Sequence, residues 1–154
     1  MPAFSLVSRA GATLMLAAAL FAAPAQAAAL YVDLGEQAGL TRIVDGLLHR
    51  ALADARIKAT LDNTNIERLQ KLLVLQFCEL TGGPCRYTGR DMKAVHAGLN
   101  LTSRHFNALV EDLQDAMDAD GVPFWTQNRL LALLAPMHRD VVTTPAAAKP
   151  GPAP

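Results

Sequence analysis

The sequence lacks the features that place many proteins in a functional class at first sight. Basic and acidic side chains balance at 14 each, so no excess of one charge favours nucleic acid or an anionic membrane as a partner. No segment alternates convincingly between apolar and polar residues as a half-buried strand does, and no internal repeat is visible. Only two cysteines are present, but a chain of 154 residues buries a core without needing cross-links. The length fits a single domain.

The first 27 residues have the pattern of a secretory signal. Arg9 supplies a positive charge, residues 10–23 are apolar apart from one glycine and one threonine, and Ala25 and Ala27 are small residues where a signal peptidase needs them. The alternative is an uncleaved membrane anchor, but the apolar run is short for a span of roughly 20 residues. We therefore predict cleavage of residues 1–27, a periplasmic or secreted protein, and no membrane span in the mature chain.

The other end of the chain has the composition of a disordered tail. Residues 143–154 consist of Thr, Ala, Lys, Gly and Pro without apolar periodicity. The folded domain is therefore predicted to cover residues 30–142.

Within that domain the apolar residues recur at helical spacing. A first helix is predicted to begin near Gly39. A second is predicted to begin with a capping box, Thr64 to Glu67, and to end at Gly82-Gly83-Pro84, which cannot continue a helix. The expected apolar faces are Ile43, Val44, Leu47, Leu48, Ala51 and Leu52 on the first helix, and Ile66, Leu69, Leu72, Leu73, Leu75, Phe77 and Leu80 on the second.

Two further helices are predicted near the C-terminus. Thr102 is expected to cap one that ends at Gly121, and Pro123 is suited to the first turn of the other. Their apolar residues are Phe106, Leu109, Val110, Leu113 and Met117 on the one, and Trp125, Leu130, Leu131, Leu133, Leu134 and Met137 on the other. The sequence thus predicts an all-α fold.

His96 differs from the other three histidines. It lies on a short segment, residues 90–97, where a helix of at most two turns is marginal by itself because nucleation is costly. A ligand bond from His96 would hold such a segment in place. His49, His105 and His138 have polar neighbours on long helices, and we interpret them as solvated or rim histidines.

The order and spacing of several short motifs resemble the group 1 truncated haemoglobins over nearly the whole of residues 30–142. These motifs are Tyr31 to Gly35, Leu52-Ala53-Asp54, Gly82-Gly83-Pro84, Tyr87-Thr88-Gly89, Met92-Lys93, His96 with Gly98, His105-Phe106 and Gly121-Val122-Pro123. The resemblance implies a truncated globin fold, a two-over-two helical sandwich around haem b. It makes His96 the proximal ligand of the haem iron, with Met92, Phe106 and Leu109 packed against the porphyrin.

The resemblance places the distal side of the haem at six leucines. Here the chain departs from the family. Leu47 and Leu48 stand where a phenylalanine and a ligand-binding tyrosine are usual, Leu61 replaces an aromatic wedge, and Leu69, Leu72 and Leu73 replace polar or cationic residues. Without the family these leucines would be interpreted as helix core. With it, they describe a haem pocket without a hydrogen-bond donor. Oxygen storage and oxygen-dependent NO detoxification both lose support.

The leading hypothesis is therefore an exported haem protein that binds a diatomic gas (O₂, NO or CO) and is not primarily an enzyme. A redox or NO-consuming haem enzyme and a haemless globin-like interaction module are the alternatives. Neither the physiological ligand nor the oligomeric state follows from the sequence. Haem propionates need cations or hydrogen-bond donors. Judged by position in the sequence, the candidate cations are Arg68, Lys71, Arg86, Arg90 and Lys93.

Cys78 and Cys85 flank the Gly-Gly-Pro turn. Because export permits disulfides and no other cysteine is available, we predict a bridge between them. The alternative is two buried thiols.

Overall fold

The computed structural model describes residues 29–143, and this part of the chain is entirely helical apart from turns and loops. The predicted leader and the predicted tail beyond Thr143 lie outside the described residues. A helical turn at residues 29–33 precedes the other elements. They are α2 (Glu36–Ala53), η1 (Lys58–Leu61), α3 (Ile66–Leu80), α4 (Met92–His96), α5 (Ser103–Ala119), α6 (Phe124–Leu134), η2 (Ala135–Met137) and α7 (His138–Val141).

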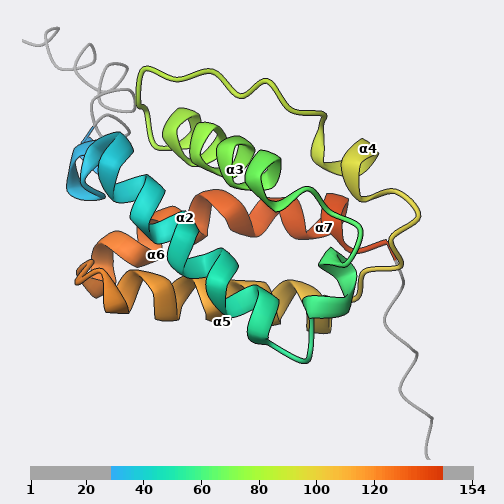
Figure 1. Cartoon of the computed structure of the whole chain (residues 1–154). Helices are drawn as coiled ribbons and strands as arrows, with labels where there is room; N and C mark the ends of the chain where they lie inside the picture. The colour runs from blue at the N-terminus through green and yellow to red at the C-terminus, as the bar shows by residue number, and fades with distance from the viewer. Residues whose placement is uncertain (1–28, 144–154) are drawn as a thin grey trace, which may run out of the picture.

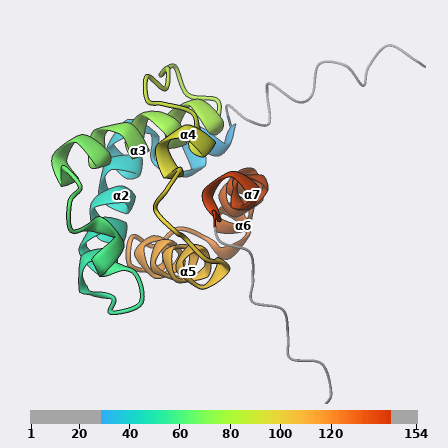
Figure 2. The ribbon, with the colours of Figure 1, turned by 90° about the vertical axis from the view of Figure 1, so that its right-hand side faces the viewer.

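The long helices form two layers. Figure 1 and Figure 2 show α2 and α3 crossing on one side of the domain and α5 and α6 on the other. Helix α2 packs against both α3 and α5, and α5 packs against α6. The prediction of an all-α, two-over-two helical sandwich is confirmed. No helix within residues 29–143 is long and apolar enough to cross a membrane.

Helix α2 forms the centre of the core because it is covered on two sides. Leu40, Ile43, Val44 and Leu47 are fully buried there. The helix begins at Glu36, not near Gly39. Gly39 instead lies within the first turns of the helix. A Cβ atom there would lie 2.0 Å from the carbonyl oxygen of Leu34. The prediction for Leu52 was wrong: it is 44% exposed, because it points away from both neighbouring helices.

The start of α3 differs from the prediction by one residue. Asn65, not Thr64, is the N-cap, and its side-chain oxygen accepts a hydrogen bond of 2.8 Å from the backbone N–H of Arg68. Glu67 pairs with Lys71 one turn later and does not reach back to the cap. An asparagine at this position supplies the same kind of oxygen that a threonine would.

The other end of α3 is closed by a disulfide. The helix ends at Leu80, immediately before the predicted Gly82-Gly83-Pro84 stop, and Cys78 and Cys85 are bonded across the turn. A Cβ atom on Gly83 would lie 2.6 Å from the sulfur of Cys78 and 2.7 Å from the ring of Tyr31. Glycine is therefore required where the bridged turn packs against the first described helical turn.

Helices α5 and α6 begin where the sequence indicates, but α6 ends at Leu134, and Met137, predicted for the same helix, lies in η2. Thr102 is the N-cap of α5, and α6 begins directly after Pro123.

The inward face of α6 was predicted wrongly at its start. Phe124 and Trp125 are 70% and 57% exposed, whereas Thr126 and Gln127 are 0% and 2% exposed. The amide of Gln127 donates to Asp118 Oδ1 at 2.6 Å and to the carbonyl of Val122 at 2.9 Å. These bonds tie the first turn of α6 to the end of α5, so Gln127 faces inward there.

The C-terminal end of the described chain is fastened to the loop between α4 and α5. Thr143 donates its backbone N–H to the carbonyl of Leu101 at 3.0 Å, and its hydroxyl accepts from the N–H of Leu101, also at 3.0 Å. This pair of hydrogen bonds fixes α7 beside the chain segment that follows His96.

Candidate haem site

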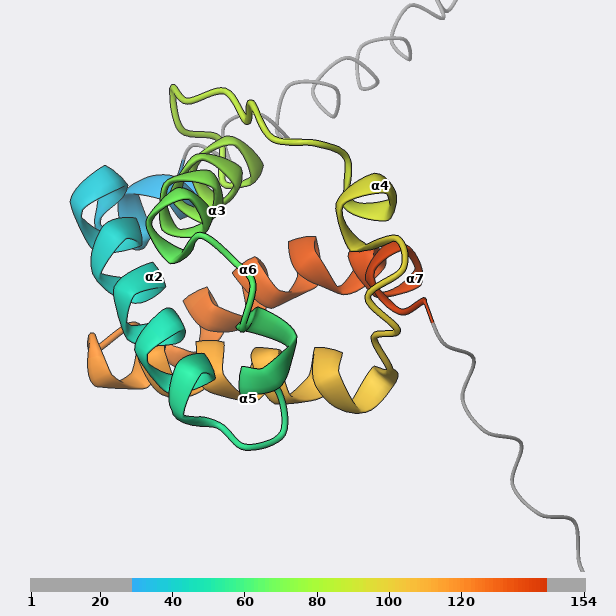
Figure 3. The ribbon, with the colours of Figure 1, turned by 45° about the vertical axis from the view of Figure 1, so that its right-hand side comes forward.

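A cavity of about 310 Å³ is lined by residues of η1, α3, α4, α5 and α7 and of the loops beside them. Figure 3 shows the ribbon of these elements. The volume of the cavity is within the range of small-molecule sites, roughly 300 to 1,000 Å³. One side consists of residues from η1, its flanking turns and α3, and the other of residues from α4, α5 and the loop between them. The residues of the wall are Ile57, Thr60, Leu61, Thr64, Leu69, Val95, His96, Leu99, Leu101, His105, Phe106, Leu109 and Val141.

His96 reaches this cavity from the last turn of α4. The short helix is capped by Asp91, whose carboxylate accepts from the N–H of Ala94 at 2.9 Å. His96 Nδ1 lies 2.7 Å from the carbonyl oxygen of Met92. A carbonyl oxygen only accepts, so in the neutral ring Nδ1 carries the proton and Nε2 keeps its lone pair. This is the arrangement by which proteins orient a metal-binding imidazole.

The facing wall is mainly hydrocarbon. The side chains of Ile57, Leu61 and Leu69, which line the cavity, consist only of carbon and hydrogen. The hydroxyl of Thr60 donates to the carbonyl of Ile57 at 2.7 Å, so its proton is used within its own segment. Thr64 contributes the other hydroxyl on this side, and it is exposed to solvent. A small ligand held against Leu61 and Leu69 thus meets no polar atom from those two side chains.

Half of the residues predicted for the site lie on the cavity wall, namely Leu61, Leu69, His96, Phe106 and Leu109. The other predicted residues, Leu47, Leu48, Leu72, Leu73 and Met92, are not part of it.

Packing explains where the remaining predicted residues lie. Leu47 and Leu48 are buried in the main core, because α2 is covered by α3 and α5 and neighbouring residues on both flanks become buried. Leu73 packs against the same core, and Leu72 is half-buried on α3. Met92 lies with its sulfur 3.3 Å from the amide nitrogen of Gln76, so it contacts α3.

The sequence interpretation missed eight wall residues. Six of them, Ile57, Thr60, Thr64, Val95, Leu99 and Leu101, come from loops or short helical segments, where periodicity gives little guidance. Val141 reaches the wall because α7 is fastened to the loop at Leu101. His105 was interpreted as a rim histidine, yet it lines the cavity, as His96 does, and also forms part of the α5 cap.

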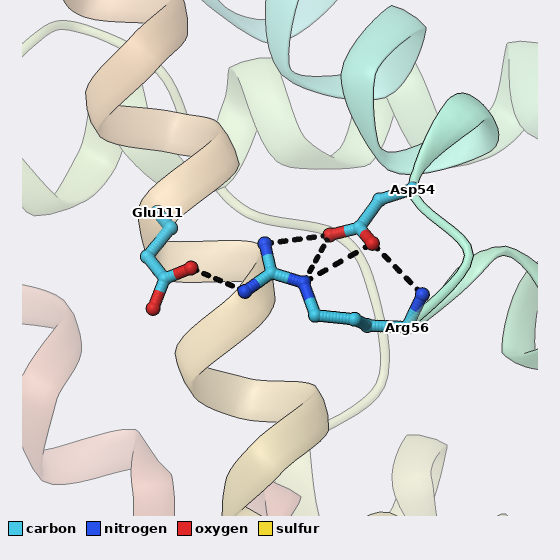
Figure 4. Close-up of polar contacts among 3 residues, drawn as sticks. All are labelled: Asp54, Arg56 and Glu111. Atoms are coloured by element: carbon cyan, nitrogen blue, oxygen red, sulfur yellow. Dashed lines mark hydrogen bonds and ion pairs between the residues drawn. The ribbon is translucent and has the colours of Figure 1, made fainter.

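An ion-pair cluster holds the segment that precedes η1 against α5. Figure 4 shows the guanidinium of Arg56 between the carboxylates of Asp54 and Glu111. The Arg56 Nε atom donates to Asp54 Oδ2 at 2.8 Å. The hydrogen bond from the Arg56 side chain is the main reason that the pKa of Asp54 is lowered. The same two carboxylates raise the pKa of Arg56. Because Ile57 follows Arg56 directly, this cluster positions one wall of the cavity.

None of the five cations that the sequence suggested for the propionates lies on the cavity wall. Lys71 pairs with Glu67 at 2.6 Å, and Arg86 pairs with Glu79 at 3.0 Å. Arg90 donates to the carbonyl of Ala94.

Comparison with known proteins identifies the family. The sequence profile of the bacterial-like globins matches residues 29–143, so the chain belongs to this family. Within it, the chain is 35% identical over 119 residues to the group 1 truncated haemoglobin GlbN of Mycolicibacterium paratuberculosis, covering 77% of this chain and 88% of the relative. The resemblance to group 1 truncated haemoglobins is thereby confirmed.

Solved structures agree with this assignment. The truncated haemoglobin of Tetrahymena pyriformis in its Fe(III) form has a TM-score of 0.71 and 28% identity, covering 73% of this chain and 97% of that one. The 2/2 haemoglobin from Synechococcus, solved in the cyanomet state with covalently attached haem, has a TM-score of 0.69 and 25% identity over 73% and 97% of the two chains.

The residues of the cavity fit the cofactor of this family, haem b. Among the described residues, the wall combines a largely apolar lining with an imidazole whose Nε2 lone pair is available. An apolar lining suits the porphyrin, and one neutral histidine is the usual protein ligand of a globin iron.

Proposed function

We propose that the mature protein is an exported haem protein that reversibly binds a diatomic gas, with His96 as the protein ligand of the iron. The hydrogen bond between His96 Nδ1 and the Met92 carbonyl carries this proposal, because it fixes the tautomer that leaves Nε2 for the metal. Bound haem supplies the iron that takes up the gas. The protein supplies the imidazole, an apolar enclosure and a wall at Leu61 and Leu69 that offers the gas no donor.

The apolar wall also bears on which gas is bound. O₂ held in this cavity would take on partial negative charge, and a hydrogen-bond donor to it would be worth about 1 to 3 kcal/mol. Without such a donor, O₂ loses roughly a factor of ten or more relative to CO. A long-lived oxygen store is therefore disfavoured, and a carrier or sensor with fast exchange fits the cavity better. The same lack of an acid–base group at Leu61 and Leu69 disfavours a peroxidase-like enzyme.

The absorption spectrum of the ferrous protein tests the coordination. We expect five-coordinate, high-spin iron without added ligand, and a six-coordinate spectrum on addition of CO. Dissociation constants for O₂ and CO, measured on the same preparation, should show no strong preference for O₂. Six-coordinate low-spin iron in the absence of ligand would contradict the proposal and would favour an electron-transfer role.

Export is a separate part of the proposal and rests on the pattern of residues 1–27. Expression of the full chain in a Gram-negative host, followed by N-terminal sequencing of the protein from the periplasmic fraction, tests it. The expected first residue is Ala28. Full-length protein retained with the membrane fraction would support the uncleaved anchor.

A further inference from the structure

Two histidines line the cavity, and the iron needs one of them. They are His96 on α4 and His105 in the first turn of α5. Among the described residues of the wall, they are the side chains that can carry a positive charge. Haem brings two carboxylates of its own, which need hydrogen-bond donors or cations. His105 is therefore the ionisable side chain of the wall that the iron site does not use.

The hydrogen bonds of the two histidines require opposite tautomers. His96 Nδ1 faces a carbonyl oxygen, so it bears the proton. His105 Nδ1 accepts the backbone N–H of Thr102 at 3.2 Å, and a backbone N–H can only donate. His105 Nδ1 is therefore unprotonated, and the proton of the neutral ring is on Nε2. One cavity thus holds a histidine with a free lone pair, which fits a metal, and a histidine with a free N–H, which fits an oxygen acceptor.

We propose that the Nε2–H of His105 donates a hydrogen bond to a propionate carboxylate of the bound haem. The proposal rests on the haem cavity described above and adds a carboxylate subsite to it. The capping role alone does not account for a histidine here. Glutamate and glutamine are the usual residues at the third position of a capping box. A glutamate would cap equally well but would place a negative charge beside the haem carboxylates, whereas histidine caps the helix and still offers a donor.

Haem and its dimethyl ester are the probes that test this subsite, since the ester lacks the two carboxylate charges. The rate of haem loss is measured with an excess of apomyoglobin as acceptor, for the full-length wild type and for His105→Leu. A hydrogen bond to a charged group is worth about 1.5 to 3 kcal/mol. His105→Leu should therefore speed the loss of haem by at least about tenfold, while the loss of the ester should change by less than about twofold.

Thr102→Ala is the matched control, because it removes the hydroxyl half of the capping box, in which Thr102 Oγ accepts from the His105 N–H at 3.4 Å, and keeps the histidine. It should change the loss of haem and of the ester by the same factor. His105→Glu, which keeps a capping residue but cannot donate, replaces His105→Leu if the latter does not fold. An equal effect of the His105 variant on both porphyrins, or no effect on either, would overturn the proposal.

Two further readouts separate this inference from the assignment of His96. The ferrous spectrum should be unchanged in His105→Leu, because the iron ligand is another residue. Nitrogen-15 NMR of the CO-bound wild type should show the His105 proton on Nε2. A proton on Nδ1 would contradict the carboxylate subsite and leave the His96 assignment intact, whereas a changed ferrous spectrum would challenge both.

Discussion

The two walls of the cavity differ in the atoms that they present. The wall from α4 and α5 contains both histidines, with ring nitrogens committed by backbone hydrogen bonds to opposite tautomers. The wall from η1 and α3 presents the hydrocarbon side chains of Ile57, Leu61 and Leu69. The ionisable side chains are thus concentrated on one side, where short backbone contacts fix each ring, and the other side is mainly hydrocarbon, with the hydroxyls of Thr60 and Thr64 beside it. The difference predicts a protein that holds its cofactor from one wall and leaves the bound gas almost free of polar contacts at the other.

The largest expected effect comes from removing the iron ligand of the polar wall. His96→Ala should abolish the Soret band or leave weakly bound haem, because the Nδ1 lone pair of His105, the other histidine of the wall, accepts the backbone N–H of Thr102. Haem stoichiometry and the ferrous spectrum are the measurements. His49→Ala is the control, since His49 is exposed on α2 away from the cavity wall. Normal stoichiometry and an unchanged spectrum in His96→Ala would refute the assignment.

The next effect concerns the disulfide between the helix that carries the apolar wall and the segment that leads to the polar wall. The disulfide joins Cys78 on α3, the helix of the apolar wall, to Cys85 in the segment that leads to α4. Replacing both cysteines with alanine should lower the free energy of unfolding by about 2 to 3 kcal/mol, since the bridge closes a short loop in the unfolded chain. Urea unfolding of the wild type with and without reductant provides the comparison. A reductant that leaves the wild-type midpoint unchanged would show that the bridge is not stabilising.

Adding a donor to the apolar wall should weaken the contrast between the two sides. Leu69→Gln places an amide on the wall, and oxygen dissociation should slow by roughly tenfold, while CO dissociation changes little. Leu69 is the better position than Leu48, because Leu48 is buried in the main core and a tyrosine there would be overpacked. Leu72→Gln, on the same helix but off the wall, is the control. Equal effects of both variants on oxygen dissociation would argue against the position of Leu69 on the wall.

The smallest expected effect concerns a buried carboxyl on α5, the helix that also carries His105. Asp112 on α5 is 7% exposed, and one of its oxygens has no hydrogen-bond partner. Burial, and next the nearby carboxylate of Asp54, raise its pKa. Asp115 acts in the same direction, whereas Arg56 and Arg50 oppose it.

Because the pKa of Asp112 is higher in the folded state, stability falls as the pH rises above the ordinary range for aspartate, about 3.9. Asp112→Asn should remove this loss. We expect the variant to be more stable than the wild type at pH 7 by roughly 1 kcal/mol, the order of the cost of an unsatisfied buried polar atom, and equally stable near pH 4. Thermal unfolding across this pH range measures the difference. If the stability of Asp112→Asn relative to the wild type instead increased as the pH falls, this prediction would be contradicted.

The sequence predicts the frame of the molecule well, because caps and stops act locally. Thr102, Pro123 and the Gly82-Gly83-Pro84 turn all mark helix boundaries where the structure has them. Local signals do not determine which side of a helix meets which neighbour. Helix α6 is apolar over most of its length, so its sequence could not reveal that Thr126 and Gln127 face inward.

The site was predicted less completely than the fold, for a related reason. His96 could be singled out from its short segment and from the family motif, but the tautomer that suits it to a metal depends on a backbone carbonyl one turn away. His105 was assigned to the rim because its neighbours in sequence are polar, and only the course of the α4–α5 loop brings it to the cavity. Leu47 and Leu48 were assigned to the haem pocket because they stand at the family's distal positions. In the structure α2 is covered on two sides, and both residues lie in the core.

The position of the cavity relative to the chain ends has a practical consequence for attaching the protein to a support. Residues 29–35 precede the start of α2, whereas the cavity residues Ile57 and Leu61 follow its end. The 18 residues of α2 span about 27 Å at 1.5 Å per residue. The two ends of the described chain lie at opposite sides of the domain (Figure 1). A linker joined before residue 29 would therefore orient the cavity outward, toward solution. A linker joined after Thr143, which is bonded to Leu101 on the cavity wall, would hold the cavity against the support and restrict the entry of haem.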